Sequence, residues 1–170
     1  FGKNTSIGNI LSYSTAKITS TVSNIGTHLG VTSAKDAKDL LQDRKNAEFL
    51  QHINNKYPKE EIMEILPMFS DRCNDAEIKR RVNDNATVPT IYEYVIGIAW
   101  YYISNKCFDL YSSLNLTLNA DFEPVLHAGK GEGDIIIDYD NITVMLEVTL
   151  MNKQAQKRGE WEPVLRHSLN

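Results

Sequence analysis

Two carboxylates at the outer ends of a predicted β-hairpin are the residues most able to do chemistry. The stretch GEGDIIIDYDNITVMLEVTL, residues 131–150, contains two apolar runs that meet at Asp140-Asn141. Both turn residues tolerate the positive φ that a two-residue type I′ turn needs. This turn pairs Asp134 with Glu147 on one face of the hairpin. The other face is apolar and is predicted to lie on the core, with Ile135, Ile137, Tyr139, Ile142, Val144 and Leu146.

The predicted pairing of Asp134 with Glu147 would place two like charges side by side. Directly opposite residues have Cβ atoms about 4.5–5.5 Å apart, and like charges there destabilise a sheet. A divalent cation held by oxygen ligands would offset the repulsion. A proton shared between the two carboxyl groups would also do so. The remaining alternative is a pair of solvated carboxylates on an exposed strand face.

A third carboxylate, Glu93, is the only charge in the apolar segment VPTIYEYVIGIAWYYIS. Pro89 suits the first turn of a helix, and so apolar a helix is predicted to be buried nearly all round. Glu93 then either sits in the first turn, favoured by the helix dipole, or points into a functional site.

The remaining patterns predict helices first and strands later, an α+β protein. Helices are expected within residues 6–30, from Ala34 to about Asn55, over Lys59–Phe69 and over Ala76–Val82. Ser33 and Asp36 form a capping box for the second helix, and Asp75 is a candidate cap for the fourth. The second helix is expected to bury Leu40, Leu41, Ala47, Leu50 and Ile53. Strands are expected at Leu114–Leu118 and Val125-Leu126.

Composition is that of one globular domain, or a small domain with a helical appendage. The 170 residues are 42% hydrophobic and 24% charged, and no apolar run approaches the length that spans a bilayer. Two cysteines fit a reducing, cytoplasmic setting and exclude a disulfide scaffold. A net charge of −4 argues against a basic surface over the whole molecule, but it does not exclude a nuclease with an acidic metal site. The chain is expected to be a fragment or a processed chain.

A run of motifs in the second half resembles a known enzyme family. Asp134 is followed thirteen residues later by E-x-T at Glu147, and then by GEWEPVLRHSLN; IYEY and FEPVLHAG precede them. This order resembles the AlwI-type branch of type IIS restriction and nicking endonucleases, in the PD-(D/E)XK nuclease superfamily. The resemblance runs from about Thr90 to Asn170, and residues 1–88 show none.

The resemblance implies a fold and a set of site residues. The fold is a PD-(D/E)XK core over residues 89–170, a mixed sheet flanked by helices and incomplete at its C-terminus, preceded by a helical connector over residues 1–88. Asp134 and Glu147 match the metal-binding carboxylates, and Glu93 matches the acidic residue of the first core helix. Glu160 and His167 match further catalytic groups near the scissile phosphate.

The implied activity is Mg²⁺-dependent hydrolysis of double-stranded DNA by a type IIS site-specific deoxyribonuclease, with Mn²⁺ as a substitute ion. Thr149 stands where the superfamily motif usually has lysine, so Lys153 or His167 would have to assist the attacking water. Lys153, Lys157 and Arg158 are either phosphate contacts or solvated loop charges. The other histidines, His28, His52 and His127, are interpreted as structural or exposed.

Such enzymes keep target recognition in a separate domain or subunit, and dimerise where both strands are cut. No membrane contact is expected. Two alternatives come from other classes: a catalytically silent DNA-binding or assembly subunit with the same fold, and a helical interaction protein whose hairpin acids are incidental. The second alternative leaves the burial of Glu93 unexplained.

Overall fold

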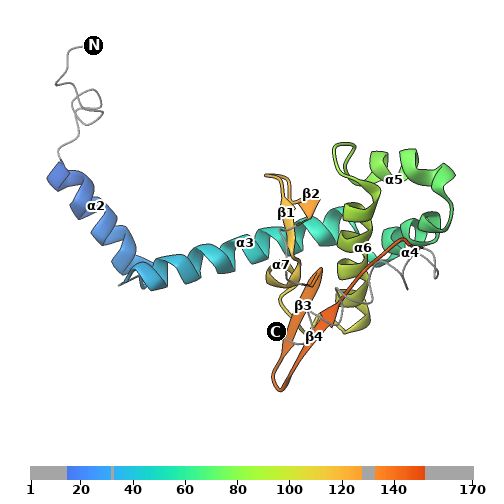
Figure 1. Cartoon of the computed structure of the whole chain (residues 1–170). Helices are drawn as coiled ribbons and strands as arrows, with labels where there is room; N and C mark the ends of the chain where they lie inside the picture. The colour runs from blue at the N-terminus through green and yellow to red at the C-terminus, as the bar shows by residue number, and fades with distance from the viewer. Residues whose placement is uncertain (1–14, 32, 128–132, 152–170) are drawn as a thin grey trace, which may run out of the picture. The chain divides into compact units, whose positions relative to one another are not determined.

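The chain is an α+β protein made of two compact units. A computed structural model describes residues 15–31, 33–127 and 133–151 (Figure 1). The units are Phe1–Lys45 and Asn46–Asn170. The extent of the motifs predicts a helical connector up to residue 88 and a nuclease core after it. Residues 46–88 lie in one compact unit with the hairpin and share its hydrophobic core.

The first unit contains helix α2, Thr15–His28, and the start of helix α3, Ala34–Lys56. The predicted capping box of α3 is confirmed. The Ser33 N–H donates to Asp36 Oδ2 at 2.8 Å, and the Asp36 N–H donates to Ser33 Oγ at 3.1 Å.

The predicted buried face of α3 is wrong over the first part of the helix. Leu40 and Leu41 are 41% and 61% exposed, and Ala47 is exposed as well. Phe49 and Ile53 are fully buried. The buried apolar side of α3 begins only at Phe49, within the second unit. Periodicity by itself therefore predicted the buried side to begin too early in the helix.

The second unit continues with short helices and one long buried helix. They are α4 Lys59–Ile65, the 3-10 helices η1 Leu66–Ser70 and η2 Arg72–Asn74, then α5 Asp75–Arg81, α6 Val88–Ile103 and α7 Leu110–Ser113. The α-helix α4 ends before Pro67, as expected of proline. Asp75 is the first residue of α5 and not its cap, which corrects the sequence-based assignment. The cap in this region is Asp71, whose side chain accepts the Cys73 N–H at the start of η2.

Two antiparallel strand pairs complete the unit: β1 Leu116–Leu118 with β2 Pro124–His127, and β3 Ile135–Tyr139 with β4 Ile142–Leu146. The β3–β4 register is the predicted one, with Ile137 opposite Val144. An isolated antiparallel bridge joins Leu114 to Ile135 and links the two pairs. Every strand pairing within the described ranges is antiparallel, so the mixed sheet implied by the resemblance is not seen there.

Helix α6 is the centre of the core. Ten of its residues are buried, and β2, α4 and α5 all contact it. Ile135 and Ile137 of β3 are fully buried in the same cluster, which confirms that part of the predicted apolar face. The prediction is wrong for Ile142, which is 65% exposed near the turn, where none of the described core elements covers it. Leu114 packs closely against α6 because residue 97 is glycine. A Cβ at Gly97 would lie 2.5 Å from Leu114 Cδ2.

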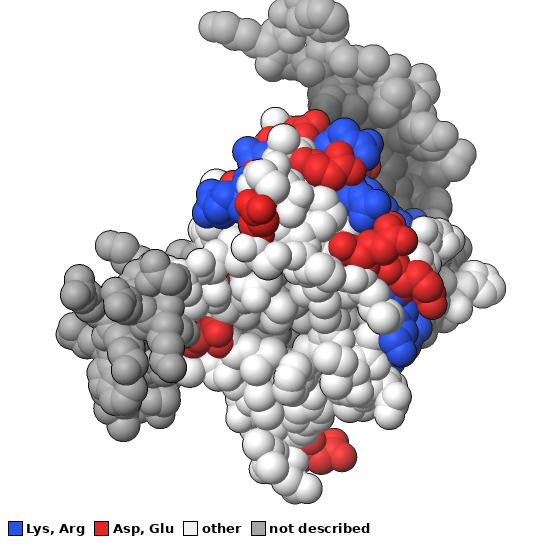
Figure 2. Space-filling model, turned by 90° about the vertical axis from the view of Figure 1, so that its right-hand side faces the viewer, with Lys and Arg blue, Asp and Glu red and all other residues white. Residues whose placement is uncertain are grey.

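The surface around α4 and α5 carries charges of both signs. Figure 2 shows lysine and arginine side chains interleaved with acidic ones on this face, beside a broad area without charge. Arg81 lies within 4 Å of Glu61, Glu64 and Glu77. The charge of Arg81 is therefore neutralised within the protein. No helix in the described ranges has the length and apolar character needed to cross a bilayer.

Candidate active site

Glu93 is held inside the first half of α6. The helix begins at a cap formed by Thr87, whose hydroxyl accepts the Thr90 N–H, and Pro89 occupies its first turn. The side chain of Glu93 is only 6% exposed. A carboxylate so far from water requires a hydrogen-bonded or charged partner.

The partner of Glu93 is His127, the last residue of β2. His127 Nδ1 lies 2.8 Å from Glu93 Oε1 and 3.0 Å from Oε2. The other ring nitrogen, Nε2, lies 3.2 Å from Thr90 Oγ1, which is itself 2.7 Å from Thr87 Oγ1. Each ring nitrogen therefore lies within hydrogen-bonding distance of one partner, Nδ1 of Glu93 and Nε2 of the Thr90 hydroxyl. The chain Thr87–Thr90–His127–Glu93 thus fixes the orientation of the carboxylate.

Sequence patterns indicated only a structural or exposed histidine at His127, and its contact with Glu93 was not predicted. The side chain is half exposed, but its Nδ1 lies 2.8 Å from Glu93 Oε1. One signal could have identified it, because His127 lies within the FEPVLHAG motif that carried part of the resemblance.

The hairpin brings Asp134 and Glu147 to its open end. Asp134 directly precedes β3 and Glu147 directly follows β4, so extending the observed register by one residue places them opposite each other. The Val148 N–H donates to Asp134 Oδ2 at 2.8 Å and orients that carboxylate. Glu147 reaches back across the hairpin: its Oε1 lies 3.5 Å from where a Cβ on Gly133 would be.

The three carboxylates are within electrostatic reach of one another. Burial raises the pKa of Glu93 from its ordinary 4.5 to about 7, and the charge of Asp134 contributes next. The hydrogen bond and charge of His127 act in the opposite direction, and the charge of Glu147 raises the pKa of Glu93 further. A raised carboxyl pKa beside two further carboxylates is typical of a functional site.

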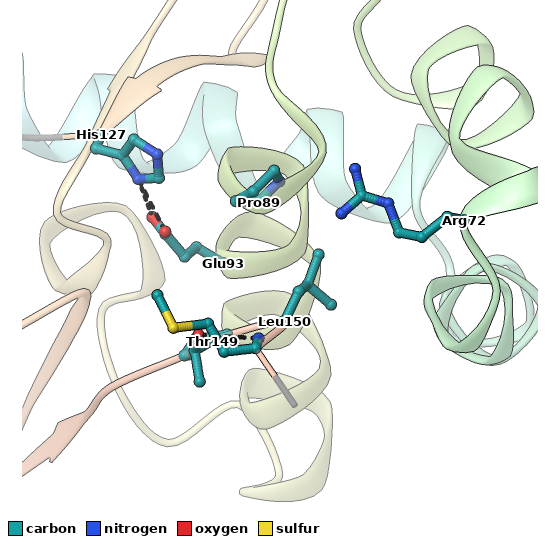
Figure 3. Close-up of a pocket in the computed structure, with 8 residues that line it drawn as sticks. Arg72, Pro89, Glu93, His127, Thr149 and Leu150 are labelled. Carbon is teal, nitrogen blue, oxygen red and sulfur yellow. Dashed lines mark hydrogen bonds and ion pairs between the residues drawn. The ribbon is translucent and has the colours of Figure 1, made fainter. Parts of the chain in front are cut away.

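A pocket of about 320 Å³ opens beside Glu93. Figure 3 shows the Glu93–His127 pair on one wall, the chain after β4 on another and Arg72 on a third. Its lining residues are Arg72, Pro89, Glu93, His127, Val148, Thr149, Leu150 and Met151. Thr149, in the place of the usual motif lysine, is therefore a wall residue, and its hydroxyl accepts the Met151 N–H at 3.2 Å.

The other predicted site residues are not placed by the structure. Glu160, His167, Lys153, Lys157 and Arg158 lie outside the described residues. Of the predicted site residues that are described, Asp134 and Glu147 of the hairpin lie within electrostatic reach of Glu93 on α6.

Comparison with known proteins adds the family. A search of curated proteins found no match. A family model described as AlwI restriction endonuclease matches residues 3–169. The match takes in the helical first half, where the sequence motifs showed no resemblance; amphipathic helices without distinctive motifs offered nothing to recognise. A family match over nearly the whole chain leads to one conclusion: the chain belongs to the AlwI restriction endonuclease family.

Proposed function

We propose that this restriction endonuclease cleaves DNA with Mg²⁺ bound by Asp134 and Glu147, and that Glu93 completes the site. The observation that carries the proposal is the burial of Glu93 beside a pocket and within reach of both hairpin carboxylates. Desolvation and like charge both oppose ionisation of such a group. A divalent cation would offset both effects, and Mn²⁺ is expected to substitute for Mg²⁺.

The donor atoms suit a hard cation, because all three side chains offer carboxylate oxygens. Within the described ranges, no three His, Cys, Asp or Glu side chains converge into a ready-made metal cage. Mg²⁺ is compatible with this arrangement, because it keeps several waters and is usually bound by one or two carboxylates together with substrate phosphates.

The chain's own residues would position the reactants. When bound, Mg²⁺ would acidify a water and neutralise charge on the phosphate and the leaving 3′ oxygen. Asp134 is oriented by the Val148 N–H, and Glu93 is oriented by His127. These hydrogen bonds fix both carboxylates before the substrate arrives. Glu93 would then hold a second ion or orient water in the ion's coordination shell.

Several finer assignments belong to the same proposal. The core is of the PD-(D/E)XK type, and the enzyme is a type IIS restriction or nicking endonuclease. A separate domain or subunit would recognise the DNA sequence, and dimerisation would allow both strands to be cut. Glu160 and His167 would act near the scissile phosphate, while Lys153, Lys157 and Arg158 would contact the DNA backbone. These proposals rest on the motifs and the family.

The test compares two aspartates of the hairpin. Asp134→Asn removes a proposed ligand, whereas Asp138→Asn alters an exposed aspartate that accepts only the Thr143 hydroxyl among described contacts. With Mg²⁺ and supercoiled DNA, Asp134→Asn is expected to lower the cleavage rate at least about 100-fold, since the ion supplies several kcal/mol of transition-state stabilisation. Asp138→Asn should cleave like the wild type. Titration calorimetry should show weakened Mg²⁺ binding for Asp134→Asn alone.

Two results would contradict the proposal. Wild-type cleavage by Asp134→Asn would remove the metal site from the mechanism. A wild-type protein that binds DNA and neither binds Mg²⁺ nor cleaves would favour the silent DNA-binding subunit. The products also separate the subtypes, because open-circular DNA indicates a nicking enzyme and linear DNA indicates cleavage of both strands.

A further inference from the structure

Arg72 lines the pocket beside Glu93, and no sequence motif pointed to it. It is the first residue of η2, and its side chain is 72% exposed. Among the eight described residues that line the pocket, it is the only arginine or lysine. Figure 3 shows its guanidinium group directed toward Pro89 and the pocket, across from the Glu93–His127 pair.

One edge of the Arg72 guanidinium group is anchored and the other is available. Arg72 Nε donates to Asp75 Oδ2 at 2.8 Å, and this is the only hydrogen bond or ion pair of Arg72 among the described residues. Asp75 is 27% exposed and lies in the first turn of α5, so it holds the guanidinium group at a fixed place. The two terminal nitrogens then present a fork that matches two phosphate oxygens.

The neighbouring arginines are engaged differently. Arg80 uses Nε and Nη2 to bind both carboxylate oxygens of Glu77, at 2.7 and 2.6 Å. Arg81 is surrounded by Glu61, Glu64 and Glu77. Neither Arg80 nor Arg81 lines the pocket. Of these three arginines, Arg72 is the one placed to meet a ligand.

A positive charge at Arg72 would offset the repulsion between the carboxylates and a DNA phosphate. When ionised, Glu93 would repel an incoming phosphate, and Asp134 and Glu147 lie within electrostatic reach of Glu93. The motif position that usually carries lysine is the neutral Thr149, which leaves the described pocket walls with Arg72 as their permanent cation. Pro89, at the N-terminal end of α6, also lines the pocket, so the positive end of the helix dipole faces this region as well.

We propose that Arg72 is a phosphate-binding residue of this site, whose terminal nitrogens hold a backbone phosphate of DNA while Asp75 fixes the guanidinium group. The inference deepens the proposed function and rests on DNA entering this pocket. Arg72 would position the DNA by binding its backbone, and this contact would carry no sequence information.

The test compares Arg72→Gln with Arg80→Gln in the full chain. Binding of a duplex DNA is measured by fluorescence anisotropy in EDTA over a range of KCl concentrations. Arg72→Gln is expected to weaken binding about tenfold, as for a lost charge-assisted hydrogen bond. It should also lower the slope of log affinity against log salt by about 0.9, the change for one phosphate contact. Arg80→Gln should leave both quantities unchanged, since Arg80 does not line the pocket and its Nε and Nη2 both bind Glu77.

A second variant and a modified DNA identify the contact. Arg72→Lys keeps the charge and loses the fork, so it should keep the wild-type salt slope with reduced affinity. In a scan of neutral methylphosphonates, one position should weaken binding by the wild type and by Arg80→Gln but not by Arg72→Gln. Far-ultraviolet circular dichroism of each variant checks that the fold is intact.

The possible outcomes separate this inference from the proposed function. If a folded Arg72→Gln keeps wild-type affinity, salt slope and methylphosphonate sensitivity, the inference is wrong even where Asp134→Asn abolishes cleavage. If Arg80→Gln changes binding as much as Arg72→Gln, the effect is general surface charge and the inference is also wrong. If Arg72→Gln loses one phosphate contact while the wild type neither binds Mg²⁺ nor cleaves, the inference stands and the enzymatic proposal fails.

Discussion

Glu93 is the residue whose ionisation should register most clearly in the stability of the protein. Its pKa is raised from 4.5 to about 7, chiefly by burial and then by Asp134. Below about pH 4.5 the carboxyl group is protonated in both the folded and the unfolded states. Between these pKa values the unfolded chain releases a proton that the folded protein keeps. The stabilisation is therefore fully present below about pH 4.5 and is lost as the pH rises through about 7.

Glu93→Gln should remove this pH dependence. In EDTA, the wild-type free energy of unfolding is expected to fall between pH 4.5 and 8 by up to about 3 kcal/mol from this group, the equivalent of the raised pKa. Urea unfolding of the two proteins at several pH values measures the difference. Equal pH dependence in wild type and Glu93→Gln would show that the carboxylate is not held in a desolvated, acidic site.

His127→Ala is a companion variant in the same experiment. It removes the hydrogen bond and charge that lower the pKa of Glu93, so the loss of stability should extend to higher pH than in the wild type. In the double variant Glu93→Gln/His127→Ala, this shift should disappear. A shift that persists without Glu93 would mean that His127 acts on another group.

At the scale of elements, the hairpin has one face in the core and one face outside it. Ile137 is fully buried in the cluster around α6, whereas the next residue, Asp138, lies on the other face and is exposed. Because the side-chain period of a strand is two, a slip of one residue would exchange the two faces. The same slip would also separate Asp134 from the face that carries Glu147.

Two matched alanine substitutions on the apolar face test how much of that face the core covers. Ile137→Ala is expected to lower the free energy of unfolding by about 2–5 kcal/mol, since it leaves a cavity in the core. Ile142→Ala, near the turn, should cost less than about 1 kcal/mol, since its side chain is mostly in water already. Chemical denaturation at a fixed pH compares the two variants. Equal costs would contradict the observed burial of Ile137 and exposure of Ile142.

For the whole molecule, the buried core belongs to the second unit. Among the residues whose burial is described, every buried hydrophobic one lies between Phe49 and Ile137. In the first unit, Ile25, Leu29, Leu40 and Leu41 are 54%, 59%, 41% and 61% exposed. The second unit therefore contains the packing that a cooperative fold needs, together with the pocket beside Glu93.

A chain that begins at Asn46 is accordingly expected to fold on its own. It should unfold in one cooperative transition, with a free energy within about 1 kcal/mol of the corresponding transition in the longer chain, since no core side chain is removed. Denaturation followed by tyrosine and tryptophan fluorescence tests this, because Tyr57, Tyr94 and Trp100 report on the core. Loss of cooperativity would mean that residues 1–45 contribute packing to the second unit.

Several features could be predicted from the sequence because their causes are local. The Asp140-Asn141 turn and the alternation on either side of it determine the register of β3 and β4. The capping box at Ser33 and Asp36 determines where α3 begins. Likewise, the isolated charge of Glu93 in an apolar helix predicted an unusual carboxylate, and the motifs after Pro89 indicated the family that matches residues 3–169.

Only the tertiary structure decided which residues surround that carboxylate. His127 is 34 positions from Glu93, and no pattern within either segment relates the two. Arg72 lies in a three-residue 3-10 helix without periodicity, and it reaches the pocket only because α5 and α6 pack together. Turns, caps and alternation act between residues close in the chain, whereas the environment of a buried charge is set by whichever distant segments the packed core brings next to it.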